Sequence, residues 1–191
     1  MKESHSFNRR FVLRTKSPDF ERSMVIIMIV LVKLSNAYRT HLNEMMDEWS
    51  LANEKIVPYA IRRIDYKEFE KYLRGLEEEE RGIPGLVPAT TYFGLDTERD
   101  MFVGAVNIRH YLNESLLLNG GHIGDGIRPS QRRKGYATKM ISLALEECRK
   151  LGIDRVLMVC DKNNIGSAKS ILNNGGVLEN EIDHRISFLQ H

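Results

Sequence analysis

The segment GHIGDGIRPSQRRKGYATKMISLALEECRKLG, residues 121–152, is the most informative part of this chain. Pro129 and Ser130 separate a short predicted strand from a longer amphipathic stretch. That stretch has an apolar residue at every third or fourth position, as a half-buried helix does: Ala137, Met140, Ile141, Ala144, Leu145, Cys148 and Leu151. Gly152 stands where a helix commonly ends on a left-handed residue. The segment therefore predicts a strand, a turn and a packed helix.

The turn in this segment is basic and contains small residues. It reads Arg132-Arg133-Lys134-Gly135-Tyr136-Ala137, and it lies where the helix begins. Backbone N–H groups at a helix start have no partner within the helix, and with the helix dipole they form a site for an anion. A Cβ atom at Gly135 would hold the backbone away from that anion, and Ala137 is nearly as small. A solvated basic turn would explain the charges but not the small residues, so we predict a phosphate site.

Length and composition indicate one soluble domain in a reducing compartment. The chain has 191 residues, of which 42% are hydrophobic and 28% are charged, ordinary values for a globular protein. The net charge of +2 is too small to indicate nucleic acid or an acidic membrane as a partner. Cys148 and Cys160 lie in apolar segments without metal-ligand spacing, and we expect them to be buried thiols. These observations favour a cytoplasmic protein without a bound metal.

The N-terminus divides into a polar part and an apolar part. Residues 1–23 are polar and rather basic, and we expect them to form a disordered tail. Residues 24–32 read MVIIMIVLV, a run that resembles a secretory signal but is far shorter than the roughly 20 residues that span a bilayer. We expect this run to be a buried strand that opens a single domain over residues 24–191.

The remaining patterns predict a mixed α/β (α+β) fold. Two β-rich runs, 89–95 and 101–108, flank a short polar turn and predict an antiparallel hairpin, and a loop is expected over 110–120. Further strands are expected at 153–160, 177–182 and 184–191, and further helices at about 36–50, 66–80 and 163–174. Because strand 153–160 directly follows a helix, we expect it to run parallel to strand 121–127. The sum is a mostly antiparallel sheet of about six or seven strands with helices on both faces.

The motifs of residues 101–182 resemble those of the GCN5-related N-acetyltransferase (GNAT) family. The pyrophosphate loop of that family reads Gln/Arg-x-x-Gly-x-Gly/Ala, and Arg132-x-x-Gly135-x-Ala137 is similar to it. An aliphatic residue followed one position later by proline precedes the loop, as Ile127-Arg128-Pro129 does, and Asn164-x-x-Ser167 resembles a second element of the family. The stretches PATTYF, NIRH and GGHIG are similar to a bacterial group of predicted acetyltransferases of unassigned substrate.

The resemblance implies a donor, a reaction and a set of binding residues. The donor would be acetyl-CoA, and its acetyl group would pass to a primary amine of a small molecule or peptide by direct attack in a ternary complex. Backbone atoms of Asp125, Gly126 and Ile127 would pair with the pantetheine arm. Asn164 would also contact this arm, although it can equally be an ordinary helix N-cap. The pyrophosphate would lie against Arg132, Arg133, Lys134, Gly135, Tyr136, Ala137 and Thr138.

The residues for proton transfer depart from the family pattern. Many members have a carboxylate as base near the start of the strand before the loop, but the matching position is Gly121, with His122 beside it. His122 is our candidate base because its ordinary pKa of about 6.5 suits neutral pH, and a packed, hydrogen-bonded histidine is the equal alternative. His110 and Glu114 are further candidates. The usual acid is a tyrosine, and its position holds Ile171.

Two departures, Ile171 and a short C-terminus, leave a second function open. The stretch from Arg185 to Gln190 is shorter than the last strand usual in the family, which could leave the acceptor side incomplete or a sheet edge exposed. A non-catalytic acyl-CoA-binding module is therefore the alternative. Trp49, Pro58 and Tyr59 are candidates for the acceptor wall, with core packing as the simpler explanation, above all for Trp49. Expected partners are the amine and, as one possibility, a second copy in a homodimer, without nucleic acid or membrane.

Overall fold

The computed structural model describes residues 28–182 and 184–190. Its seven strands, counted within these residues, are Ile29–Val32 (β1), Ala89–Asp96 (β2), Met101–Arg109 (β3), Ile123–Ile127 (β4), Val156–Asp161 (β5), Val177–Ile182 (β6) and Arg185–Gln190 (β7). The α-helices of this part are Arg39–Leu51 (α1), Phe69–Arg81 (α2), Glu114–Asn119 (α3), Tyr136–Lys150 (α4) and Ile165–Leu172 (α5). None of the helices described is long and apolar enough to cross a membrane. The expected strand over 24–32 is present from Ile29 on, and the expectation for residues 1–27 lies outside the described residues.

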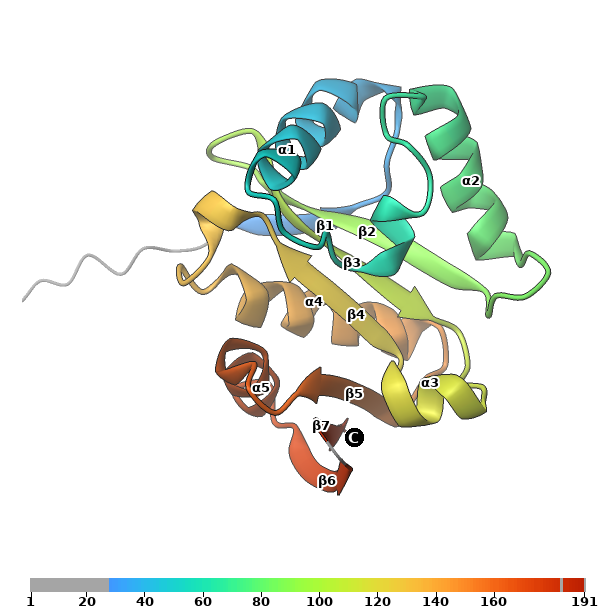
Figure 1. The fold of residues 1–191 in the computed structure, drawn as a ribbon, viewed down its shortest axis with the longest axis vertical. Coiled ribbons are helices and arrows are strands. Elements are labelled where there is room, and N and C mark those ends of the chain that lie inside the picture. Colours follow the sequence, from blue (N-terminus) through green and yellow to red (C-terminus); the bar gives the residue numbers. More distant parts are fainter. Residues whose placement is uncertain (1–27, 183, 191) are drawn as a thin grey trace, which may run out of the picture.

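The strands form two sheets instead of one continuous sheet. The first has the order β1-β2-β3-β4 and the second the order β5-β7-β6, and neighbouring strands are antiparallel in both. Strands β4 and β5 lie beside each other without the parallel ladder that we expected, and the sheets meet at an isolated bridge between Gly121 and Met158. Figure 1 shows β4 and β5 close together near α3 and far apart at their other ends.

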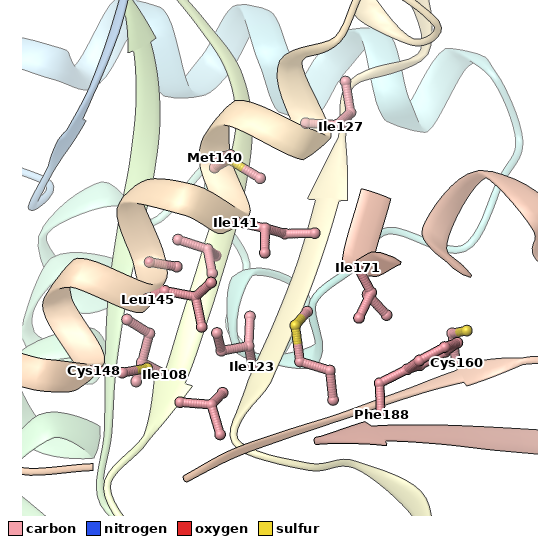
Figure 2. Close-up of a cluster of buried hydrophobic side chains, with 14 of the residues drawn as sticks. Ile108, Ile123, Ile127, Met140, Ile141, Leu145, Cys148, Cys160, Ile171 and Phe188 are labelled. Atoms are coloured by element: carbon pink, nitrogen blue, oxygen red, sulfur yellow. The ribbon is translucent and has the colours of Figure 1, made fainter. Parts of the chain in front are cut away.

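Helices cover both faces of the first sheet, as the sequence predicted (Figure 1). Helix α1 packs on β3 and α2 packs on β2, whereas α4 packs on the opposite face against β1, β3 and β4. The α1 and α2 side is filled by large side chains that include Leu42, Met45, Met46, Trp49, Tyr72, Phe93 and Phe102. The α4 side is filled by the apolar face of this helix together with residues of β4, β5, α5 and β7, many of them drawn in Figure 2. The predicted mostly antiparallel α+β fold is confirmed.

Two local expectations need correction. Residues 110–120 are not all loop, because Glu114–Asn119 forms the short helix α3, whose N-cap Asn113 accepts a hydrogen bond from the Leu116 N–H. The short C-terminus leaves no edge exposed at β7, because this strand lies between β5 and β6 and pairs with both. Within the described residues, the outer strands of the second sheet are β5 and β6.

Candidate functional site

The basic turn presents a row of free backbone N–H groups at the start of α4. Gly135 is the N-cap of α4 with φ +88°, and Arg133 has φ +60°, so two alternate residues adopt the left-handed conformation. Left-handed residues in such a turn direct successive N–H groups into one concavity that suits an anion. Within the described part of the chain, the N–H groups of residues 133–138 donate no hydrogen bond. These groups and the dipole of α4 make a site for phosphate oxygens.

The three basic side chains of the turn differ in their surroundings. Arg132 is already engaged, since its Nε donates to the Ile127 carbonyl oxygen at 3.0 Å and its Nη2 lies 2.6 Å from a Glu54 carboxylate oxygen. Lys134 donates from Nζ to the Gln131 side-chain oxygen at 3.0 Å. Arg133 is exposed, and no contact holds its guanidinium to another described residue. The turn therefore leaves Arg133 as the cation most available to an anion.

Tyr136 contributes its backbone and not its ring. Its side chain is buried in the core on the α4 side, and its hydroxyl donates to the carboxylate of Asp96. Burial and the Asp96 carboxylate raise the pKa of Tyr136. This packing holds the first turn of α4 against the sheet and fixes the direction of its N–H groups.

One edge of β4 is open beside the second sheet. The Arg109 N–H donates to the His122 carbonyl oxygen, and the Arg128 N–H donates to the Val103 carbonyl oxygen. Hydrogen-bonded pairs alternate along an antiparallel ladder, so the peptide groups of Gly124 and Gly126 also face β3.

The peptide groups of Ile123, Asp125 and Ile127 consequently face away from β3. We call this row the open edge of β4. Since β4 and β5 form no ladder, an extended ligand can pair with this edge as a strand would. Arg132 already occupies the Ile127 carbonyl oxygen at its far end.

Gly126 is required by the loop that covers β4 on the α1 side. A Cβ atom at this position would lie 2.3 Å from the Val57 carbonyl oxygen and 2.9 Å from the Trp49 ring. Trp49 is fully buried, which agrees with the core-packing explanation, and Pro58 is buried as well. Tyr59 is 51% exposed and is the member of the expected acceptor wall that remains accessible.

Asn164 is the N-cap of α5. Its side-chain oxygen accepts from the Ser167 N–H at 3.0 Å, as the N-cap alternative predicted. The residue is exposed at the end of β5, and its side-chain nitrogen donates to no described residue. Capping therefore leaves the amide N–H groups of Asn164 free for a ligand.

His122 joins the two sheets where they meet. Its backbone N–H donates to the Leu157 carbonyl oxygen at 2.7 Å, and its Nδ1 accepts from the Leu157 N–H at 3.0 Å. Burial and the nearby Arg109 guanidinium lower the pKa of His122. A neutral ring that accepts at Nδ1 carries its proton on Nε2, so neither nitrogen has a free lone pair. This geometry favours a packed, hydrogen-bonded histidine. The role of His122 as base stays a prediction.

The other two candidates for the base lie at the same end of the first sheet. The His110 ring is hydrogen bonded to the Thr90 hydroxyl at 2.9 Å. Glu114 is exposed in the first turn of α3. No contact among the described residues places either side chain beside the open edge of β4.

Hydrogen bonds and an ion pair link α1 to the chain just before the basic turn, a contact that the sequence did not predict. The Glu48 carboxylate accepts from the Arg128 Nε at 2.7 Å, from the Ser130 N–H at 2.7 Å and from the Ser130 hydroxyl at 3.0 Å. Burial raises the pKa of Glu48, but the hydrogen bonds from Ser130 and Arg128 outweigh it and hold the pKa below its usual value. Arg128 itself is buried and also donates to the Phe102 carbonyl oxygen. This network fixes the chain where it leaves β4 and enters the turn.

A family model matches the sequence, and solved structures match the fold. Residues 31–177 match the family model described as acetyltransferase (GNAT) domain, and no curated protein sequence matches the chain. Similar solved structures include the microcin C7 self-immunity acetyltransferase MccE in complex with acetyl-CoA and AMP, with 17% identity, a TM-score of 0.61, and coverage of 85% of this chain and 91% of that chain.

Two similar structures are acetyltransferases of ribosomal proteins. RimL, the ribosomal L7/L12 alpha-N-protein acetyltransferase in complex with coenzyme A, has 15% identity, a TM-score of 0.61, and coverage of 87% of this chain and 95% of that chain. The ribosomal-protein-S5-alanine acetyltransferase from Vibrio fischeri has 16% identity, a TM-score of 0.59, and coverage of 85% and 91%. At such identities the structures show a shared fold. The family model spans well over half of the 191 residues, and the chain therefore belongs to the GNAT acetyltransferase family.

Proposed function

We propose that this acetyltransferase moves the acetyl group of acetyl-CoA to a primary amine of a small molecule or peptide, by direct attack in a ternary complex. The observation that carries the proposal is the combination of a free N–H row at the basic turn with the open edge of β4. A strand-like ligand with a phosphate end fits both features, and acetyl-CoA has this form. The ribosomal proteins named for RimL and for the Vibrio fischeri structure support a peptide amine as the acceptor.

The donor would be held mainly by backbone atoms. In this proposal the pyrophosphate lies on the N–H groups of residues 133–138, with the Arg133 guanidinium beside it. The pantetheine arm pairs with the peptide group of Asp125 and with the N–H of Ile127, whose carbonyl oxygen Arg132 occupies, and Asn164 donates to the arm from α5. Gly126 turns its peptide group toward β3 and contributes through its small size. Arg132 and Lys134 shape the turn and add positive charge.

The same edge would assist the chemical step. An N–H group of the open edge that donates to the thioester oxygen polarises the carbonyl and stabilises the negative charge of the tetrahedral intermediate. The amine must lose a proton before it attacks. For His122 to take that proton, its ring would have to release the Leu157 N–H, so a water relay is the competing route.

Thermal melting with acetyl-CoA, with CoA and without ligand tests the donor site. A ligand at about 100 times its dissociation constant should stabilise the wild-type protein by about 2.7 kcal/mol. Gly135→Glu should abolish this stabilisation, because it places a side chain and a negative charge in the turn. Gly85→Glu is the matched control, since Gly85 has a similar φ of +84° but open space around it in the loop after α2.

The results separate the possible functions. Absence of stabilisation in the wild type would refute binding of acetyl-CoA. Stabilisation that persists in Gly135→Glu would refute the placement of the pyrophosphate. Stabilisation without CoA release across a panel of amines would favour the non-catalytic binding module, for which the buried Ile171 at the usual acid position is the supporting observation.

A further inference from the structure

Asp125 places a carboxyl group beside an apolar core. Side chains alternate along a strand, so Asp125 projects on the same face of β4 as Ile123 and Ile127. Figure 2 shows these two isoleucines between α4 on one side and Ile171 with Cys160 on the other. Burial raises the pKa of the Cys160 thiol of β5, and the Asp125 charge adds a smaller part of this increase.

The carboxyl group has an unusual environment for a charge. No described side chain donates a hydrogen bond to it, and no charged side chain contributes to its shifted pKa. The elements packed on this face contribute apolar groups, which are Met140 and Ile141 of α4, Met158 of β5 and Ile171 of α5. They also contribute the Cys160 thiol and the Ser167 hydroxyl that is hydrogen bonded to it. Burial raises the pKa of Asp125 to about 6, and its own backbone N–H offsets this only in part.

Asp125 is nevertheless not sealed inside the protein. The residue is partly exposed, and its carboxyl group accepts a hydrogen bond from its own backbone N–H. Its peptide group belongs to the open edge of β4, where the proposed thioester lies. A carboxyl group with a raised pKa on a residue of a binding edge is typical of a functional group.

We propose that the Asp125 carboxyl group donates the proton that the departing CoA sulfur receives. This inference rests on the proposed function and assigns the role for which Ile171 offers no hydroxyl. When the tetrahedral intermediate collapses, the carbon–sulfur bond breaks and its electron pair goes to sulfur. The proton of the Asp125 carboxyl group then moves to this sulfur. The carboxylate that remains regains a proton from water, which has taken up the proton released by the amine.

The direction of this transfer is favourable. A free thiol has a pKa of about 8.5, above the pKa of about 6 of Asp125, so the proton moves from oxygen to sulfur. A bound acyl-CoA would also exclude water from the exposed part of Asp125. Removal of water disfavours the charged form and raises the pKa further, so more of the protein carries the proton near neutral pH.

Bound CoA tests the proximity of the two groups without any acceptor. The thiol pKa of CoA in complex with the protein is measured from the ultraviolet absorbance of the thiolate. An ionised carboxylate beside the sulfur should raise this pKa by on the order of one unit in the wild type, and Asp125→Asn should remove the increase. Asp154→Asn, at an exposed position before β5, is the matched control and should keep it.

The outcomes distinguish this inference from the proposed function. If CoA fails to stabilise the wild type, the proposed function itself is refuted. If CoA binds but its thiol pKa is the same in wild type and Asp125→Asn, only the role of Asp125 is refuted. Once an amine that accepts the acetyl group is identified, Asp125→Asn should lower turnover by about 100-fold while the dissociation constant of acetyl-CoA changes little. An unchanged turnover would also overturn the inference.

Discussion

The buried charge of Asp125 should lower the free energy of unfolding even without ligand. Its pKa rises from 3.8 to about 6 on folding, and each pKa unit corresponds to about 1.36 kcal/mol. Above pH 6 the ionised carboxylate therefore lowers the free energy of unfolding by about 3 kcal/mol. This is an upper value, because Asp125 keeps part of its surface in solvent.

The sign follows from the proton count. Between about pH 4 and 6 the folded protein keeps the proton on Asp125, while the unfolded chain has released it. The destabilisation by Asp125 is thus complete above the folded pKa and fades as pH falls toward the unfolded value. Asp125→Asn has no charge at either pH, so its advantage over wild type should be up to about 3 kcal/mol at pH 8 and below about 1 kcal/mol at pH 4.

The assay is thermal unfolding of both proteins at the two pH values. For a chain of this length, about 3 kcal/mol corresponds to an increase of about 6–12 °C in Tm at most. Carboxylates with a lowered pKa, such as Asp47, Glu48 and Asp96, lose stabilising interactions as pH falls. Both proteins share this loss, so the difference between them isolates Asp125. An equal difference at pH 4 and pH 8, or a less stable variant at pH 8, would refute the reasoning.

Three further variants test the structure around the site. Glu48→Gln should lower the free energy of unfolding by about 1–3 kcal/mol in urea titrations, because Arg128 loses its charged partner. It should also weaken acetyl-CoA binding in calorimetry. An unchanged affinity would show that the Glu48 contacts do not position the basic turn. Gly126→Ala should destabilise by about 1–3 kcal/mol, because the new Cβ atom meets the Val57 carbonyl oxygen, and a neutral effect in the same titrations would contradict the close approach. His122→Ala should lower Tm and leave the dissociation constant of CoA unchanged, and an unaltered pH–rate profile in this variant would remove His122 from the role of base.

Local patterns predicted the helices and strands of this chain better than their assembly. The apolar period of α4 gave its position within one residue, because such a period needs only the helix itself. Helix α3 was missed because six residues carry too little periodicity, although Asn113 is a visible capping signal. The junction of the two sheets depends on Gly121, which has φ +64° and approaches the Leu157 backbone, and no local pattern encodes that contact.

Prediction of the candidate site from the sequence was also limited by contacts between residues that are distant in the chain. The spacing of Gly135 and Ala137 indicated the anion site, since small residues are needed there for backbone reasons. The charges did not indicate which side chain remains available, because Arg132 is held by Glu54, a residue distant in sequence. The environment of Asp125 was likewise invisible, since its carboxyl group is surrounded by elements that follow it in the chain.

The open edge of β4 also bears on the solubility of the ligand-free protein. Unpaired strand edges invite pairing with other chains and so promote aggregation, and an inward-pointing charge is one of the devices that prevent it. Asp125 is such a charge, and Arg132 additionally covers one carbonyl oxygen of the edge. The side chain that reduces stability at neutral pH would therefore protect the exposed edge from self-association until acetyl-CoA covers it.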